Sequence, residues 1–345
     1  MHEQSPGLRR LAKTTALSAG FLVAVYPLRA AAHVKWFAAY DVAAQPKELA
    51  EMCCPMFFLL IACSLVTIWL LSHVERTVVG AFLLRTIDRL GRVLQPRTEA
   101  IFRACTAVFF VGLWVLGNII LTPELKTDVV AISWLQFAIA VGMFWRATMI
   151  FSAIGIAFLF AFGVYSYGAF HMMDYPIFLG AAIYLGLSGL QRSLFGRRPI
   201  DYARWGAAIT LIWASVEKWA YPQWTFPLLQ THPTLAMGFN DVFYMIAAGV
   251  VEFGLAFALL WTPLVRRLAA IALTAMFVSA VFEFGKLDAI GHLLIVTILV
   301  AIAVDDEPKV ERRPILAPAY YCAALLGIVV LYYGAHAAIY GTKII

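Results

Sequence analysis

The stretch VFYMIAAGVVEFGLAFALLW, residues 242–261, is apolar throughout except for one carboxylate, Glu252. A helix needs about 20 such residues to cross the hydrocarbon core of a bilayer, and this stretch has that length. Small residues surround the carboxylate, because Ala248, Gly249 and Ala256 lie one helical turn away and allow close helix packing. The stretch therefore predicts a membrane-spanning helix whose carboxylate faces other helices.

The rest of the chain has the same character. Of its 345 residues, 63% are hydrophobic and 13% are charged, whereas soluble domains average about 45–50% apolar and about 25% charged residues. This composition excludes an ordinary soluble protein. The net charge of +6 does not indicate a nucleic-acid partner, because the basic residues fall in short connections between apolar stretches.

Apolar stretches with helical flanks predict eleven spans, and so an all-α, polytopic bundle of membrane helices. In chain order the predicted spans are 16–37, 54–72, 104–121, 129–145, 147–170, 175–190, 205–221, 242–261, 268–282, 289–304 and 315–339. The first span also resembles a cleaved signal peptide, with a basic start and an alanine run at 30–32; we expect a retained helix because Arg29 adjoins that run.

The basic residues predict an orientation. When alternate connections are placed on opposite sides, most of the 26 Lys and Arg residues fall on one side, which is typical of the cytoplasmic face. The N-terminus is then cytoplasmic and the C-terminus outside, as in a multi-pass protein of a bacterial-type inner membrane. Segment 76–103 carries Arg85, Arg89 and Arg92 on nearly one helical face, which predicts an amphipathic helix lying on the inner leaflet.

A four-span block occurs twice, at 102–192 and 203–307. The third helix ends in YSYG (165–168) in one block and FEFG (282–285) in the other. An even number of spans predicts parallel repeats related by an axis along the membrane normal. The expected organisation is an N-terminal hairpin with the amphipathic segment (1–101), the two repeats and a C-terminal helix (314–345).

Four short motifs in the second repeat support a resemblance. They are RWG (204–206), EK (217–218), GVVE (249–252) and GHLL (291–294). The repeat resembles the DoxX-like family of four-helix membrane proteins, whereas the first repeat is similar only in its span pattern. The resemblance implies an association with redox complexes, because members of this family resemble, or associate with, the membrane subunit of thiosulfate:quinone oxidoreductase.

Ionisable residues inside a membrane are expensive to bury and are therefore functional candidates. Here they gather in the second repeat, which predicts a single site opening outward. The candidates for acid–base work on a substrate are Glu217, Glu252, Glu283 and His292. The candidates for contacting a cofactor are Trp213, Lys218, Lys286 and Asp288. A quinone head group is the expected cofactor, since it needs hydrogen-bond donors and a proton acceptor beside an apolar slot.

Other interpretations of these residues stay open. Lys218 and Lys286 could pair with Glu217, Glu283 or Asp288 and staple the helix ends together. Proton relays and metal sites use similar residues, but no metal-ligand set is assigned, because the Glu and His positions stand singly on separate helices. Residues 171–174 (HMMD) could attract copper or form an interfacial loop, and the loop 221–240 could cap the site above Glu217 or dock an outer partner.

Several cofactors are not expected. The chain has no Gly-rich phosphate loop, no Cys-x-x-Cys and no paired histidines at haem spacing, so nucleotide, Fe–S and haem sites are not predicted. The five cysteines form no disulfide pattern, since three lie within spans and Cys53 and Cys54 are adjacent.

Together these features predict a quinone-linked redox module, or the membrane anchor of an extracytoplasmic oxidoreductase. The alternatives are a proton- or ion-coupled transporter and a non-catalytic assembly subunit. The expected partners are the lipid bilayer and an extracytoplasmic protein.

Overall fold

The computed structural model describes residues 34–306 and 313–343. This part of the chain is built from helices and contains no strand. Most of the first predicted span, with the question of its cleavage, lies outside the described residues; its last residues form a short turn, η1 (Val34–Trp36). Each predicted span from 54–72 onward coincides with a helix.

Seven helices of the described chain are long and apolar enough to cross a membrane, so the protein is a multi-pass membrane protein. They are α3 (Pro55–Val74), α5 (Thr98–Leu116), α7 (Met149–Tyr167), α12 (Asp241–Leu259), α13 (Pro263–Phe284), α14 (Lys286–Val304) and α15 (Ala317–Tyr340). Two apolar helices are shorter, α6 (Val130–Gly142) and α9 (Pro176–Leu190), while α10 (Pro199–Ala220) is long but less apolar. The count of eleven spans stays a prediction.

The helices form two neighbouring units. We call α5, α6, α7 and α9 the first unit, and α10, α12, α13 and α14 the second. Within each unit consecutive helices pack together, and the units meet where α9 packs on α10 and α14 packs on α5. The α9–α10 crossing is close, because a Cβ built on Gly180 would lie 3.1 Å from the Cα of Gly206. This shared pattern is what a duplication would produce, although the duplication itself stays a prediction.

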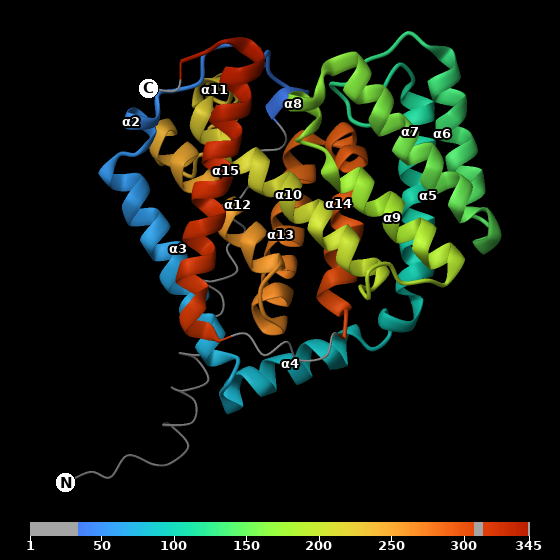
Figure 1. Ribbon diagram of the computed structural model, residues 1–345, viewed down its shortest axis with the longest axis horizontal. Helices are drawn as coiled ribbons and strands as arrows, with labels where there is room; N and C mark the ends of the chain where they lie inside the picture. The colour runs from blue at the N-terminus through green and yellow to red at the C-terminus, as the bar shows by residue number, and fades with distance from the viewer. Residues whose placement is uncertain (1–33, 307–312, 344–345) are drawn as a thin grey trace.

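The remaining long helices lie outside these units. Helices α3 and α15 pack against each other and α3 packs against α12, on the side of the second unit away from the first (Figure 1). Helix α4 (Val78–Gly91) lies across one end of the bundle, and the short helix α11 (Phe226–Thr231) lies at the opposite end (Figure 1). We call these the α4 end and the α11 end.

Local sequence explains several helix boundaries. Helices α3, α9, α10 and α13 begin with proline, which has no N–H to lose and a fixed φ suited to the first turn. Helix α12 begins at Asp241 and is capped by Asn240, whose side chain accepts hydrogen bonds from the backbone N–H groups of Val242 and Phe243. The first helix of the first unit begins at Thr98 and that of the second unit at Pro199, while the bounds of the repeats stay predictions.

Arginine ion pairs hold the α4 end together. Arg267 of α13 is buried and pairs with Asp88 of α4. Arg198, just before α10, pairs with Asp305, just after α14, at 2.7 Å. Helix α4 exposes apolar side chains, among them Val78 and Phe82, beside its arginines. Its lying on a leaflet stays a prediction.

Candidate functional site

A buried lysine joins two buried carboxylates at the α11 end. The Nζ of Lys35 lies 2.5 Å from Oδ2 of Asp174 and 2.6 Å from Oε1 of Glu217. Lys35 is 6% exposed and Asp174 is 1% exposed. A buried ion pair is costly to desolvate and is weak evidence for stability alone. Stability alone therefore does not explain why these three charges are buried together.

The three residues come from three parts of the fold. Lys35 lies in the turn η1, Glu217 lies near the end of α10, and Asp174 lies between α8 (Ala169–Met172) and α9. The chain turns sharply at Gly168, with φ +86°, so that α8 can follow α7 directly. This turn brings Asp174 of the first unit opposite Glu217 of the second.

Aromatic rings surround the ammonium group. The Nζ of Lys35 lies 5.4 Å from the ring centroid of Tyr40 and 5.6 Å from that of Trp224, within cation–π range. Trp224 in turn stacks on Tyr221, with centroids 4.1 Å apart. Since Trp224 belongs to the loop 221–240, the structure supports the interpretation of that loop as a cap over Glu217.

A third carboxylate lies beside this group without a partner. Both carboxylate oxygens of Glu124, in the connection between α5 and α6, are buried and have no hydrogen bond of standard geometry in the described part of the chain, although the Thr122 hydroxyl and the Glu124 backbone N–H lie near enough to lower the pKa of the carboxyl group. Burial raises the pKa of Glu124 to about 8, while the positive charge of Lys35 acts to lower it. Glu124 therefore changes its protonation near neutral pH.

An imidazole completes the cluster. His171 of α8 is buried, packs edge-on against Tyr40 with centroids 5.6 Å apart, and has no described hydrogen-bond partner for Nε2. Burial and, to a smaller extent, the positive charge of Lys35 lower its pKa to about 4, while the charge of Asp174 acts to raise it. We call Lys35, Glu124, His171, Asp174 and Glu217 the Lys35 cluster. Burial alone would lower the pKa of Lys35, but its two carboxylate partners raise it above its usual value.

Helix α15 supports the cluster from the side. Tyr221 donates a hydrogen bond to the carbonyl of Ala44 at 2.8 Å, and its hydroxyl lies 2.8 Å from Nε2 of His336. The same imidazole nitrogen lies 2.8 Å from the carbonyl oxygen of Val42. These bonds fix segment 37–48, which carries Tyr40, to the helices beneath it.

The candidate residues predicted from sequence have different nearest partners. Glu217 joins the Lys35 cluster, whereas Glu252 forms an ion pair with Lys218, the residue after Glu217. Oε1 of Glu283 lies 3.0 Å from Nδ1 of His232. One convergent site in the second repeat stays a prediction.

The other predicted residues have local roles. Nδ1 of His292 lies 2.9 Å from Oδ2 of Asp288, and the imidazole packs on Trp36 and Phe277. Trp213 is buried against Phe170 and Tyr332. For Lys286 no ion pair is found among the described residues. The expected lysine staples are wrong in detail, because Lys218 pairs with Glu252 and not with Glu217, Glu283 or Asp288.

Sequence reasoning missed Lys35 and Glu124 and did not connect Asp174 with Glu217. Lys35 lies at the outer end of the predicted span 16–37 and Glu124 lies in a polar connection, so the sequence places neither charge inside the membrane. A usable signal was present in the HMMD stretch, where His171 and Asp174 follow an apolar helix directly. In residues 34–306 and 313–343, no group of three or more His, Cys, Asp or Glu side chains is arranged to hold a metal.

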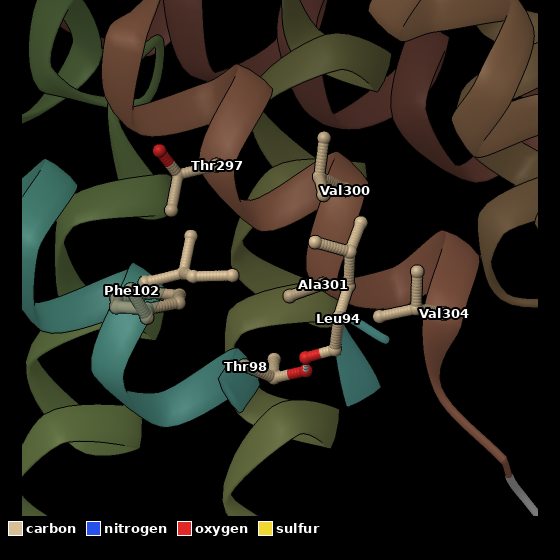
Figure 2. Close-up of a pocket in the computed structure, with 8 residues that line it drawn as sticks. Leu94, Thr98, Phe102, Thr297, Val300, Ala301 and Val304 are labelled. Atoms are coloured by element: carbon tan, nitrogen blue, oxygen red, sulfur yellow. Dashed lines mark hydrogen bonds between the residues drawn. The ribbon is translucent and has the colours of Figure 1, made fainter. Parts of the chain in front are cut away.

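A cavity of about 230 Å³ lies at the α4 end, where α5, α9, α10 and α14 meet. Its polar lining comes from Gln95, Thr98, Tyr184, Ser188 and Asp305. A small apolar recess adjoins it between α5 and α14, and Figure 2 shows the residues that line it. Both hollows share Thr98, Ala301 and Val304. The cavity and the Lys35 cluster therefore lie at opposite ends of the contact between the two units.

Comparison with known proteins adds no relative. No family model, no curated protein and no solved structure matches this chain. The function therefore has to be argued from the site, and the DoxX-like resemblance stays a prediction.

Proposed function

We propose that this chain is a proton-coupled membrane transporter whose proton is carried by Glu124. The observation that carries the proposal is the carboxyl group of Glu124, which is buried without a hydrogen-bond partner beside Lys35, Asp174 and Glu217. A carboxyl group that only stabilised the fold would have a donor, since buried polar groups are nearly always hydrogen-bonded.

The pKa of Glu124 suits this task. A pKa of about 8 lets the group bind and release a proton at physiological pH. The charges of Lys35 and Asp174 act on it in opposite directions, Lys35 lowering and Asp174 raising the pKa. Any change in the occupancy of the Lys35 cluster therefore changes the proton affinity of Glu124, which is the coupling that a proton-driven transporter requires.

The position of the cluster favours transport. Transporters with repeated units bind substrate and coupling ions where the units meet, near the bilayer midplane; the Lys35 cluster lies where the units meet, toward the α11 end of that contact. The Lys35 cluster takes Glu124 and Asp174 from the first unit and Glu217 from the second. A polar cavity opens on the same contact at the α4 end, which faces the cytoplasm if the positive-inside rule holds.

Quinone-linked redox chemistry is the second candidate. The aromatic surroundings of the cluster and the unbonded Nε2 of His171 favour it, because a quinol head group could stack on rings and pass a proton to a carboxylate. The DoxX-like resemblance implies the same chemistry. In that case the chain would act as a redox module or as the anchor of an extracytoplasmic oxidoreductase.

Electrical recording on a solid-supported membrane tests the proton role. The purified full-length protein, reconstituted into liposomes, should give a transient charge movement after a pH jump, with an apparent pKa near 8. Glu124→Gln should abolish it, whereas Glu48→Gln, at an exposed carboxylate of the α11 end, should leave it unchanged.

The same preparation tests the quinone alternative. Solvent extraction would show bound quinone, and oxidation of decylubiquinol by a soluble electron acceptor would show turnover. A wild-type protein that shows neither charge movement nor a proton flux in liposomes that contain a pH dye overturns the transport proposal. Quinol oxidation that depends on Glu124 would then establish the second candidate.

A further inference from the structure

We infer that the Lys35 cluster is a binding site for a primary ammonium group, and that Lys35 is its intramolecular occupant in this structure. The ligand class is small organic amines in their protonated form. The inference adds a substrate class to the proposed function; only its transport aspect rests on that function, since binding can be measured without transport.

The geometry around Nζ is that of a receptor for a protonated amine. Two carboxylate oxygens lie 2.5 and 2.6 Å from the nitrogen, and two aromatic rings lie 5.4 and 5.6 Å from it. A primary ammonium group has three N–H donors, which suit several acceptors at once. Aromatic faces attract the same charge, as they do in sites for cationic ligands.

The cluster offers more acceptors than Lys35 uses. Oδ1 of Asp174 and both carboxylate oxygens of Glu124 are buried and have no hydrogen-bond partner in the described part of the chain. Asp174 is 1% exposed, so bulk water does not satisfy its free oxygen. An arrangement that served only to neutralise Lys35 would not need a third buried carboxyl group.

The occupant and its receptor belong to different parts of the fold. Asp174 and Glu217 are held by α9 and α10, which pack against each other, and by α8, which packs against α7; none of these contacts involves η1. Lys35 enters from a three-residue turn outside the two units. Withdrawal of the Lys35 side chain would therefore leave both carboxylates in place and open a site for an ammonium group of the same size.

The charge arrangement links such a ligand to the proton of Glu124. A positive charge at this position lowers the proton affinity of Glu124, as Lys35 already does. Once Lys35 has withdrawn, a cation that enters the vacated cluster would therefore favour release of the proton from Glu124. The expected reaction is an exchange of an ammonium ion for a proton, with one positive charge moving in each direction.

Chemical rescue of a Lys35→Ala variant tests the binding site. The full-length variant, purified in detergent, should unfold at a lower temperature than the wild type, because Asp174 and Glu217 lose their counter-ion. Ethylammonium or propylammonium chloride should raise that temperature by several degrees in a saturable way, since a ligand that binds only the folded state stabilises it. The wild type should not respond, because Lys35 fills the site.

The controls separate a specific site from general salt effects. Potassium chloride and tetramethylammonium chloride at equal concentration should not rescue Lys35→Ala, because neither cation has an N–H donor. Lys47→Ala removes a partly exposed lysine paired with Glu51 and should show no dependence on alkylammonium. If Lys35→Ala does not fold, the double variant Lys35→Ala/Glu217→Gln leaves one buried charge and should show a weaker rescue.

Absence of alkylammonium rescue in both variants, or equal rescue by potassium, overturns the inference. Transport is measured separately, as alkalinisation or acidification of liposomes that contain a pH dye after addition of propylammonium chloride to the Lys35→Ala protein. Rescue without a proton flux that depends on Glu124 would leave the binding site established and contradict the transport proposal.

Discussion

The carboxylates of Asp174 and Glu217 share one ammonium group, that of Lys35, although they belong to different helical units. Each carboxylate contributes one oxygen to the shared cation. Arg198 and Asp305 join the beginning and the end of the second unit at the α4 end, whereas the ion pairs of Lys35 join the two units at the α11 end. Relative movement of the units has to break or rearrange these contacts, which places the cluster where such movement can be controlled.

Removing the shared cation should destabilise the protein strongly. We expect Lys35→Met to lower the free energy of unfolding by about 3–5 kcal/mol, because two buried carboxylates are left without a counter-ion. The triple variant Lys35→Met/Asp174→Asn/Glu217→Gln should recover most of this loss, since it leaves no buried charge in the trio. Reversible unfolding in mixed detergent micelles measures both values.

Lys47→Met is the matched control, because Lys47 forms only a long, partly exposed ion pair with Glu51. Its expected effect is below about 1 kcal/mol. Equal losses in Lys35→Met and Lys47→Met would contradict the buried trio.

The stability of the protein should fall as the pH rises from about 6.5 to about 8, and change little between about 5 and 6.5, where the contribution of His171 opposes that of Glu124. The pKa of Glu124 is raised from 4.5 to about 8 in the folded state, so over this range the unfolded chain has lost a proton that the folded protein keeps. Deprotonation then destabilises the fold, with a slope of at most about 1.4 kcal/mol per pH unit for one proton. Thermal unfolding at stepped pH measures the slope.

His171 affects the stability at acidic pH, in the direction opposite to Glu124. Its pKa is lowered from 6.5 to about 4 in the folded state, so as the pH falls below 6.5 the unfolded chain takes up a proton before the folded protein does. This uptake lowers the contribution of His171 to stability. Glu124→Gln should reduce the alkaline slope and leave the acidic one, whereas Glu48→Gln should keep both. An alkaline slope that is unchanged in Glu124→Gln would show that another group is responsible.

The helices could be predicted from sequence because lipid imposes a simple rule on them. Apolar stretches of sufficient length become helices in any membrane protein, since every backbone polar group must be bonded internally. Each predicted stretch from 54–72 onward is a helix for this reason. The crossing of short helices such as α6 and α9 could not be predicted in the same way, because their length alone does not decide it.

The site was predicted poorly because it depends on contacts between distant segments. Glu217 was found from its place near the end of an apolar helix, but its partner Lys35 lies far away in the sequence. Glu252 looked exceptional by position, yet Lys218 neutralises it locally. Glu124 carries the least conspicuous sequence signal and the most unusual environment, and only the folded arrangement shows that its carboxyl group has no partner.

Loss of the Tyr221 hydroxyl should loosen segment 37–48, which covers the Lys35 cluster. Tyr221→Phe removes its hydrogen bond to the carbonyl of Ala44 and its contact with His336, while the ring stays able to stack on Trp224. We expect a loss of about 1–3 kcal/mol, as for a buried group left unsatisfied. Hydrogen exchange followed by mass spectrometry should show faster exchange in segment 37–48.

The control for this change is Tyr202→Phe at the α4 end, where Tyr202 donates a hydrogen bond to the carbonyl of Leu194 at 2.6 Å. It should leave exchange in segment 37–48 unchanged. Faster exchange in both variants would indicate a general loss of stability and not a local release of the cover.

The glycines that end YSYG and FEFG should be equally intolerant of a side chain, although nothing crowds them. Gly168 ends α7 with φ +86° and ψ 155°, and Gly285 ends α13 with φ +75° and ψ −148°. This backbone region is almost restricted to glycine, so alanine there should cost about 1–3 kcal/mol. A Cβ at either position would meet no atom within 4 Å, so steric crowding adds nothing to the cost.

Gly334→Ala in α15, also in open space but without a positive φ, should be neutral or stabilising by about 0.5–1 kcal/mol. Thermal unfolding of the three variants in detergent measures these differences. If Gly168→Ala and Gly285→Ala lose no more stability than Gly334→Ala, the backbone of these two turns does not require glycine. The turns would then not fix the positions of Asp174 and Asp288.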